Sequence, residues 1–463
     1  IRRPPRSTRK ESSAASDVYK RQIYNIWKIE ELRNRIFITL FFIAIYRLGA
    51  QVVLPGIDSV QLGELSSRTE GGGLLGILNA FTGGAFANAS IFALGIMPYI
   101  SASIVVQLMG IAVPYLQKLQ KEGESGRKTI NQITRWLTIL ICVVQAPAYL
   151  YSLGALGVPE SAFIMGKGVG FIVPSVIILV TGCVFAMWLG EKITDRGIGN
   201  GISLLITVGI IASLPQSFAQ EFTSRVFESN GGLILILIEL VVWVIVIGLC
   251  VLLVLAVRQI PVQYARRTRS GSLDRNQAGT RQYIPLRLNA SGVMPIIFAQ
   301  AIMFAPVYLG QLLGDSNIGL WMQASFSDMF GLWYNILFGL LIVGFTFFYT
   351  AITVPTNKMS DDLKRSGGFV PGIRPGSETS EFLDKVMSLI TFPGSLFLAA
   401  LSVLPAIVVQ IMDMQQGWAL FYGGTSLLIM VGVAIDTIQQ INAYLLNRHY
   451  DGLMKTGKNR KLA

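Results

Sequence analysis

The chain has 463 residues, of which 52% are hydrophobic and only 14% are charged. Soluble domains carry about 25% charged residues, and a single soluble core stops growing at roughly 250–300 residues, so this composition excludes an ordinary soluble enzyme. The formal net charge of +12 would favour nucleic acid as the partner of a soluble protein, but basic loops on one side of a membrane explain it better here.

Residues 1–22 differ from the rest of the chain, because they are basic, rich in Ser and Arg, and without apolar periodicity. They contain no apolar h-region, so they do not form a secretory signal. We expect a disordered basic tail here, or an artefact of the sequence.

Ten apolar stretches follow, each close to the 17–25 residues that a membrane-spanning helix needs. Their apolar residues run continuously instead of alternating, which indicates helices and not the strands of a membrane barrel. The fold class that follows is an all-α polytopic membrane protein. We expect the spans at 34–53, 90–113, 132–153, 169–189, 201–218, 233–257, 292–313, 332–354, 386–410 and 423–446.

Basic residues alternate from one connecting segment to the next. Of the 38 Lys and Arg residues, 34 lie in segments 1–36, 114–136, 190–200, 258–290, 355–385 and 447–463. Cytoplasmic loops of membrane proteins carry such an excess, so both termini are expected in the cytoplasm, which agrees with an even number of spans.

The connection after the first span contains an apolar segment, Leu74–Phe81, that is far too short to cross a bilayer. Glycines at 71–73 and 83–84 flank it as hinges. We expect this segment to re-enter a cavity in the protein, because lipid cannot satisfy a broken backbone. The alternative is a helix that lies on the outer surface.

Two cytoplasmic segments, 258–290 and 355–385, are polar, basic and rich in glycine at their tips. Their arginines could enforce topology or bind anionic lipid. Much shorter loops would enforce topology equally well, so we expect these loops to dock a soluble partner.

Catalytic motifs are absent from the sequence: it contains no Walker A loop, no GxSxG, no HExxH and no paired intramembrane carboxylates. The three cysteines, Cys142, Cys183 and Cys250, lie inside apolar runs, and the single histidine cannot form a metal cluster. We therefore expect no enzyme activity, no cofactor and no metal.

Few charged residues fall within the spans, and three of them lie away from the cytoplasmic ends. Arg47 lies near the outer end of the first span, from which its head group can reach water. Glu239 and Asp436 have no opposite charge that the sequence makes evident, so we expect hydrogen-bonded structural roles for them.

Isoleucines recur in the second, fifth, seventh and tenth spans. Taken alone, such residues are usually packing or lipid-facing, although branched aliphatic side chains can also form a constriction that excludes water and ions. Composition does not choose between these readings. The isoleucines are Ile96, Ile100, Ile206, Ile210, Ile297 and Ile429.

Seven long motifs resemble the SecY family of protein-conducting channels, over residues 23 to 455. They are IYRLGAQVVLPGID (45–58), SIFALGIMPYISASI (90–104), QKEGESGRKTINQITR (120–135), DRGIGNGISLLI (195–206), YIPLRLNASGVMPIIFA (283–299), FVPGIRPG (369–376) and GTSLLIMVGVAIDTIQQINAYL (424–445).

This resemblance implies two pseudo-symmetric five-helix halves around an hourglass pore. The halves would be residues 23–218 and 233–446, with an external hinge at 219–232 and a cytoplasmic tail at 447–463. The implied function is to pass unfolded secretory polypeptides across the bacterial cytoplasmic membrane and to release transmembrane segments laterally into it.

The resemblance also implies site residues. The six isoleucines match the family's pore ring. The plug would comprise Leu74, Leu75, Ile77, Leu78 and Phe81. Spans 90–113 and 132–153 would face spans 292–313 and 332–354 at a lateral gate. Arg374 matches the docking loop for a motor or ribosome, and Arg266 and Arg267 lie in the other docking loop.

The partners implied by the resemblance are small SecE- and SecG-like membrane subunits, a SecA motor ATPase, the ribosome, preproteins bearing signal sequences, SecDF- and YidC-like factors, and membrane lipid. Two other classes remain as alternatives. An ion- or metabolite-coupled transporter needs neither large basic loops nor a plug, and a membrane enzyme needs catalytic groups that the sequence lacks.

Overall fold

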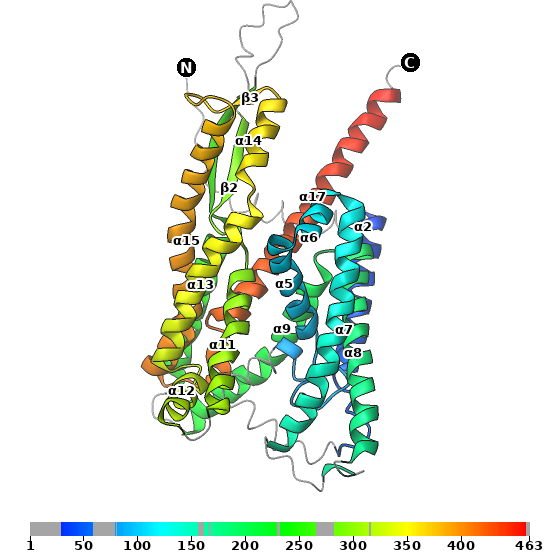
Figure 1. Ribbon diagram of the computed structural model, residues 1–463, viewed down its shortest axis with the longest axis vertical. Helices are drawn as coiled ribbons and strands as arrows, with labels where there is room; N and C mark the ends of the chain where they lie inside the picture. The colour runs from blue at the N-terminus through cyan, green and yellow to red at the C-terminus, as the bar shows by residue number, and fades with distance from the viewer. Residues whose placement is uncertain are drawn as a thin grey trace, which may run out of the picture.

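The computed structural model describes residues 29–58, 79, 81–155, 162–164, 166, 168–228, 232–264, 282–313 and 316–459. Most of these residues form long helices that run side by side (Figure 1). The first half contains α2 (Glu30–Gly49), α5 (Met97–Ala112), α6 (Pro114–Lys121), α7 (Glu124–Ala155), α8 (Val169–Arg196), α9 (Gly201–Thr223) and the π-helical turn η2 (Ser224–Glu228). The second half contains α10 (Gly232–Leu255), α11 (Met294–Leu312), α12 (Asn317–Ser327), α13 (Leu332–Thr353), α14 (Thr356–Arg365), α15 (Ser377–Met412), α16 (Gln416–Ala419) and α17 (Gly424–Asn459).

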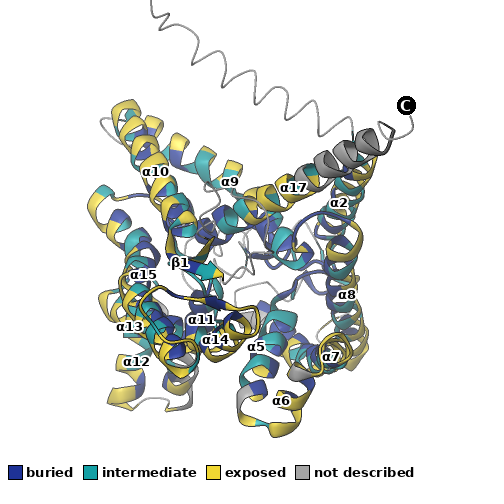
Figure 2. Cartoon of the chain, turned by 90° about the horizontal axis from the view of Figure 1, so that it is seen from above, coloured by how far each residue is buried: buried dark blue, intermediate teal, exposed yellow. Residues whose placement is uncertain are grey.

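All ten predicted spans coincide with helices. Within the described residues, 7 helices are long and apolar enough to cross a membrane, and the bent pair α5 and α6 raises this number to 8. The other two predicted spans correspond to α2 and α11, which are helices of 20 and 19 residues but are shorter or less uniformly apolar. Large apolar side chains are exposed around the outside of the bundle, as a lipid-facing surface requires (Figure 2).

The second predicted span, 90–113, is helical only from Met97 onward. Residues 83–96 form turns, with a positive φ at Gly83, Gly84 and Gly95 that favours glycine. At its other end α5 meets α6 at a bend of 101°, directly before Pro114, whose ring and missing N–H do not allow a helix to continue. The span expected at 90–113 therefore began too early, whereas its end at 113 agrees with the end of α5.

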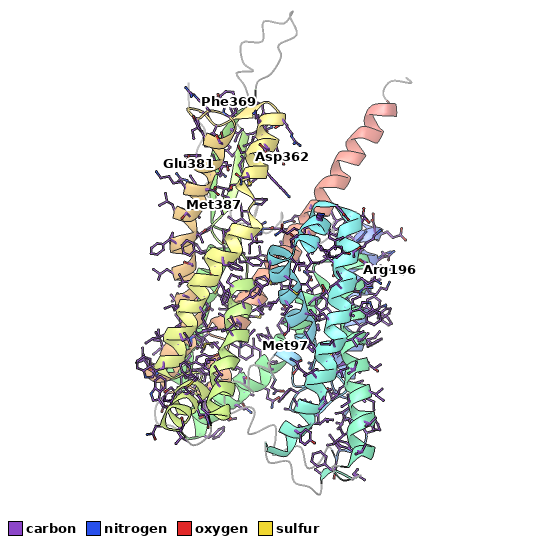
Figure 3. All side chains as sticks on the ribbon, in the orientation of Figure 1. Met97, Arg196, Asp362, Phe369, Glu381 and Met387 are labelled. Carbon is purple, nitrogen blue, oxygen red and sulfur yellow. The ribbon has the colours of Figure 1, made fainter. Side chains whose placement is uncertain are left out.

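The two predicted docking loops contain a small antiparallel sheet, which the sequence analysis missed. Strands β1 (Val257–Tyr264), β2 (Gln282–Arg287) and β3 (Gly368–Phe369) lie in the order β2-β1-β3. One side of the sheet packs on α14 and α15 through Leu363 and Leu383. Figure 3 shows Phe369, Asp362, Glu381 and Met387 gathered around this sheet at one end of the molecule, which we call the sheet face. We call the other end, which carries α12, the opposite face.

The halves pack together along one side. In the first half, α5, α7, α8 and α9 pack in succession, and in the second half α11, α13 and α15 do the same. The last helix, α17, packs on α10, α15 and α11 of its own half and also on α9 of the first half. Figure 1 shows the remaining helices of the two halves as separate groups on either side of α17 and α9.

Candidate channel seal and gate

The isoleucines come from four helices, two in each half. Ile96 is the N-cap residue of α5, and Ile100 follows one turn later. Five of the six predicted residues, all except Ile96, belong to one contiguous apolar cluster between the halves, in which Ile206, Ile210 and Ile429 are buried and Ile100 and Ile297 are partly buried. Ile96 is buried in the adjoining cluster, against which Ile100 also packs. We call these six residues the isoleucine cluster.

Met97 also packs against this cluster, and Figure 3 places it near the middle of the molecule's long axis. The isoleucine cluster therefore lies at the depth of the bilayer centre if the long helices cross a membrane. The six residues of the isoleucine cluster have branched aliphatic side chains that neither donate nor accept hydrogen bonds, and the other members of the surrounding apolar cluster include Met97 and Phe81.

Of the predicted plug residues, Leu74, Leu75, Ile77 and Leu78 lie outside the described residues. Phe81 is described, is buried, and belongs to the same apolar cluster as Ile206 and Ile429. The carboxyl end of the predicted plug therefore touches the group of residues that it is expected to cover.

The turns that follow Phe81 are held firmly. Thr82 Oγ1 accepts a hydrogen bond from the Phe86 backbone N–H at 3.1 Å, and the Tyr149 hydroxyl donates to the Phe86 carbonyl oxygen at 2.8 Å. Arg47 donates from Nη1 to the Gly83 carbonyl oxygen at 2.9 Å. The expectation that Arg47 simply reaches toward water is therefore replaced by a specific contact with this segment.

This segment approaches α9 so closely that only glycine fits on the helix. A Cβ atom on Gly209 would lie 2.6 Å from the Phe81 carbonyl oxygen and 3.2 Å from the Gly83 nitrogen. Real Cβ atoms almost never come within 3.0 Å of such an atom, so any side chain on Gly209 would push the segment away. Gly209 lies directly before Ile210, so the close contact of segment 81–83 with α9 is next to the isoleucine cluster.

On the side away from α17, the halves meet between α5 and α13. The Tyr349 hydroxyl donates to Gln107 Oε1 at 3.4 Å, and Gln107 Nε2 donates to Ser103 Oγ at 3.1 Å. A hydrogen bond of 3.4 Å is long and therefore weak. The predicted gate helices α5 and α13 are in contact, through a link that a small movement would break.

On the α17 side, polar contacts join the halves at the sheet face. Gln440 of α17 accepts through Oε1 from the Gly199 backbone N–H at 2.9 Å, and the Arg35 guanidinium lies 5.0 Å from the centre of the Tyr444 ring. Gln439 accepts from Arg287 of β2 at 3.2 Å. Side chains on α17 thus bind both the start of α9 and the sheet.

At the opposite face, a buried ion cluster joins the halves. Arg225 of η2 pairs with Glu221 at 2.8 Å and with Glu239 of α10 at 3.1 Å, and all three side chains are less than a tenth exposed. Arg225 Nη2 also donates to the carbonyl oxygens of Met412 and Asp413, which end α15. Segment 219–228 is thus helical and pinned to the second half.

This cluster corrects the expectation that Glu239 has no opposite charge. Its partner is Arg225, one of the four basic residues outside the segments expected in the cytoplasm. Asp436, in contrast, is exposed on α17 and does not belong to the core. The signal that could have found the pair was the presence of an intramembrane acid near one end of its span and a rare external arginine within reach of that end.

The predicted docking residue Arg374 is presented on a stiff turn at the sheet face. Its side chain is 88% exposed and lies 3.8 Å from Glu378. The Thr379 hydroxyl donates to the Arg374 carbonyl oxygen at 2.8 Å, and Ser360 Oγ donates to the Gly376 carbonyl oxygen at 2.6 Å. These bonds fix the turn against α14 and α15. Arg266 and Arg267 lie outside the described residues.

Solved protein-conducting channels share this arrangement. A structure described as showing that the plug domain of the SecY protein stabilises the closed state of the translocation channel aligns with a TM-score of 0.58 and 16% identity, over 89% of this chain and 92% of that chain. Sec61 from a canine ribosome–channel complex aligns with a TM-score of 0.53 and 15% identity, over 89% and 92% of the two chains. These likenesses define the fold as that of a helical, multi-pass, protein-conducting channel.

Sequence comparison then gives the family. The SecY family model matches residues 90–438. The protein translocase subunit SecY of Halalkalibacterium halodurans is 38% identical over 458 residues, which cover 94% of this chain and 100% of that protein. The chain belongs to the SecY family of channel subunits, as its motifs predicted, and this family consists of channels and not of enzymes.

Proposed function

We propose that this channel passes unfolded secretory polypeptides between its two halves and releases transmembrane segments laterally into the bacterial cytoplasmic membrane. One observation carries the proposal: Ile206, Ile210, Ile297 and Ile429, from both halves, meet in one apolar cluster with Phe81. A polypeptide that crosses between the halves at this depth would have to displace these side chains.

The isoleucine cluster suits a seal for a substrate of any sequence. Branched aliphatic side chains exclude water and ions by dewetting, and they can part around a passing chain because no hydrogen bond fixes them. The plug, 74–81, would add a second layer on the opposite face. Deleting 74–81 should raise ion conductance in planar bilayers while polypeptide import continues. An unchanged conductance would contradict the role of this segment as a plug.

Lateral release would occur between α5 and α13. Each buried methylene favours lipid by about 0.8 kcal/mol, so an apolar segment that reaches an open gate leaves the channel, whereas a charged segment continues across. The long Tyr349–Gln107 hydrogen bond supports a gate at this position, because it offers little resistance to opening.

We place the sheet face in the cytoplasm, together with both termini. The start of α2, the end of α8 and the carboxyl part of α17 share this face through the contacts of Arg35 with Gly197 and Tyr444. The basic segments predicted to be cytoplasmic lie next to the ends of helices at the sheet face. The relative from Halalkalibacterium halodurans is bacterial. We infer that the location is the bacterial cytoplasmic membrane.

The energy for transport would come from a partner docked on the sheet face. Arg374 on its stiff turn suits bidentate contact with a carboxylate of a SecA-type motor or a phosphate of ribosomal RNA. The solved relative from the canine complex is bound to a ribosome, which supports the second partner. SecE- and SecG-like subunits, preproteins with signal sequences, and SecDF- and YidC-like factors complete the proposed set.

The proposal is tested with the chain reconstituted in vesicles together with SecE- and SecG-like subunits and a SecA-type ATPase. We expect protease-protected uptake of a preprotein that needs ATP and a functional signal sequence. The same vesicles without the motor, under a proton or sodium gradient, provide the control. Gradient-driven accumulation of small solutes without preprotein uptake would favour a secondary transporter instead.

A further inference from the structure

Helix α12 lies outside the spans, between the end of α11 and the start of α13 on the opposite face (Figure 1). It begins at Ser316, whose Oγ accepts a hydrogen bond from the Gly319 backbone N–H at 3.3 Å. It packs on α11, where Gln323 Nε2 donates to the Gly310 carbonyl oxygen at 2.9 Å. A Cβ atom on Gly310 would lie 3.2 Å from the Gly319 carbonyl oxygen, so the two helices touch at their backbones.

The outward face of α12 is apolar. Gly319 and Phe326 point into the protein and are buried, whereas Ile318, Leu320 and Trp321 are at least half exposed. The sequence of α12, NIGLWMQASFS, contains no charged residue. A surface helix in water normally turns charged and polar residues outward, so this helix has the exposure pattern of one that meets an apolar medium.

Two tryptophans mark the depth of this surface. Trp321 on α12 and Trp333 in the first turn of α13 lie with ring centroids 6.1 Å apart at 66°, and both are about half exposed. Tryptophan is enriched at the boundary between lipid and water. Leu309 of α11 and Ile336 of α13, one turn after Trp333, are also about half exposed, so exposed apolar side chains extend from α12 onto both neighbouring helices.

We propose that α12 lies in the membrane interface on the opposite face, with Ile318, Leu320 and Trp321 inserted between lipid head groups and the upper acyl chains. The lipid surface is the expected occupant because the patch is continuous with the lipid-facing wall and carries no charge that would select a protein partner. Since α11 carries Ile297, α12 ties the end of a helix of the isoleucine cluster to the bilayer. With the topology proposed above, the leaflet that α12 meets is the outer one.

Site-directed spin labelling tests the depth of α12. The three native cysteines are buried, so a single introduced cysteine can be labelled in the folded protein. The test position is Leu320→Cys, with Val244→Cys on α10 as the lipid control and Ser366→Cys at the sheet face as the aqueous control. In phosphatidylcholine–phosphatidylglycerol vesicles, relaxation by oxygen and by a water-soluble nickel chelate is measured for each label.

We expect the label at 320 to be relaxed by oxygen, and to lie shallower than the label at 244. Relaxation by nickel equal to that at 366 would show α12 in water and overturn the proposal. Low access to both reagents would show a protein covering and would overturn it as well. Depth does not depend on which leaflet is involved, so either result would leave the proposed transport function untouched.

A second measurement avoids labelling. In vesicles of phosphatidylcholine brominated near the head group, the intensity of tryptophan emission that bromine quenches, per protein molecule, should fall in Trp321→Phe and remain unchanged in Trp418→Phe. Trp418 is 2% exposed inside the second half, which makes it the matched buried control. An unchanged quenched intensity in Trp321→Phe would contradict contact between α12 and lipid.

Discussion

The side chains of the isoleucine cluster differ from most core residues, because they must pack tightly when the channel is closed and separate when it opens. Ile429 is 3% exposed and Ile210 is fully buried, so each fills its place in the closed state. Neither offers a hydrogen bond that must be broken on opening. A polar group at such a position would change the balance between the closed and open states.

Replacement of Ile429 by Asn should loosen the closed state. A buried amide without partners costs about 1–3 kcal/mol, and this cost falls on the closed state only, because water solvates the amide when the channel is open. We expect higher resting ion leakage and better export of preproteins with defective signal sequences. Ile429→Leu, which keeps the volume and the apolar character, is the control and should behave as the parent. Equal export in Ile429→Asn and the parent would make Ile429 an ordinary packing residue.

Replacement of Arg374 by Glu should abolish motor-driven import while folding and association with small subunits continue. The turn is held by backbone contacts of Thr379 and Ser360, which the substitution leaves in place. Arg374→Lys should be partly defective, since it keeps the charge and loses the planar fork. ATP-dependent import into vesicles is measured, with co-purification of the small subunits as the folding control. Lys358→Glu, an exposed charge reversal on α14, should import normally, and an equal loss there would reduce Arg374 to one basic charge among several.

At the scale of single residues, the sequence motifs identified the isoleucines that the structure brings together. They missed the ion pair between Glu239 and Arg225, two residues whose roles depend on each other. Five of the six isoleucines lie in long, family-specific motifs, and Ile210 follows one turn after Ile206, which ends one of them. Hydropathy alone did not reveal the pairing of Glu239 with Arg225, because it does not indicate that η2 brings a basic side chain against α10.

At the scale of helices, the packing of segment 81–83 on α9 depends on one missing side chain. Gly209→Ala adds a single methyl group where the Phe81 carbonyl oxygen would lie 2.6 Å away, so the segment or the helix must shift. Overpacking of this kind costs about 1–3 kcal/mol. We expect raised ion leakage with normal expression of the protein, measured by single-channel recording.

The control for this prediction is Gly248→Ala on α10. A Cβ atom there meets nothing within 4 Å, so the added methyl group should leave conductance unchanged. Increased leakage in both variants would indicate a general effect of replacing helical glycines, and would contradict a specific role for the contact between Gly209 and Phe81.

The limits of element prediction have clear causes. The long helices were predictable because a continuous apolar run of membrane length has few other structures available to it. Strands β1 and β2 were missed because each contains a proline, Pro261 and Pro285, and a proline inside a short run argues against a strand. The turns before Met97 were missed because an apolar run does not distinguish turns buried in protein from a helix in lipid.

At the scale of the whole molecule, the two halves are joined unequally. Along α17 and α9 they share extensive packing, the Gly199–Gln440 hydrogen bond and the buried Arg225 cluster. Between α5 and α13 they share the long Tyr349–Gln107 hydrogen bond. Relative motion of the halves should therefore open the α5–α13 side and leave the other side closed.

Removing this hydrogen bond should make lateral opening easier. A hydrogen bond of normal length contributes about 0.5–1.5 kcal/mol and this long one belongs at the lower end, so Tyr349→Phe should shift segments of borderline hydrophobicity from translocation toward membrane insertion by about twofold. Gln107→Leu should do the same. The measurement is the ratio of inserted to translocated product for a series of test segments.

The double variant identifies the cause. If the two residues act through one bond, combining Tyr349→Phe with Gln107→Leu should give no more shift than either change alone. Additive shifts would mean that each side chain acts by itself, and would contradict a shared gate contact.

The positions of the long helices were accessible from the sequence because hydropathy is a sum over many residues, and an error in a single residue does not change it. The side on which the halves adhere was not accessible. It depends on α17, which packs on helices of its own half and also on α9 of the first half.

The position of α17 also sets the order in which the molecule becomes complete during synthesis. Helix α9 leaves the ribosome more than two hundred residues before the end of α17, yet its face is covered only when α17 arrives. A chain interrupted after α15 would contain most of its spans, but both Ile206 on α9 and Gly199, just before α9, would lack their partners on α17. Partly synthesised chains expose surface in this way until their last element packs. The contact between the two halves along α9 therefore becomes complete only with the last helix to be synthesised.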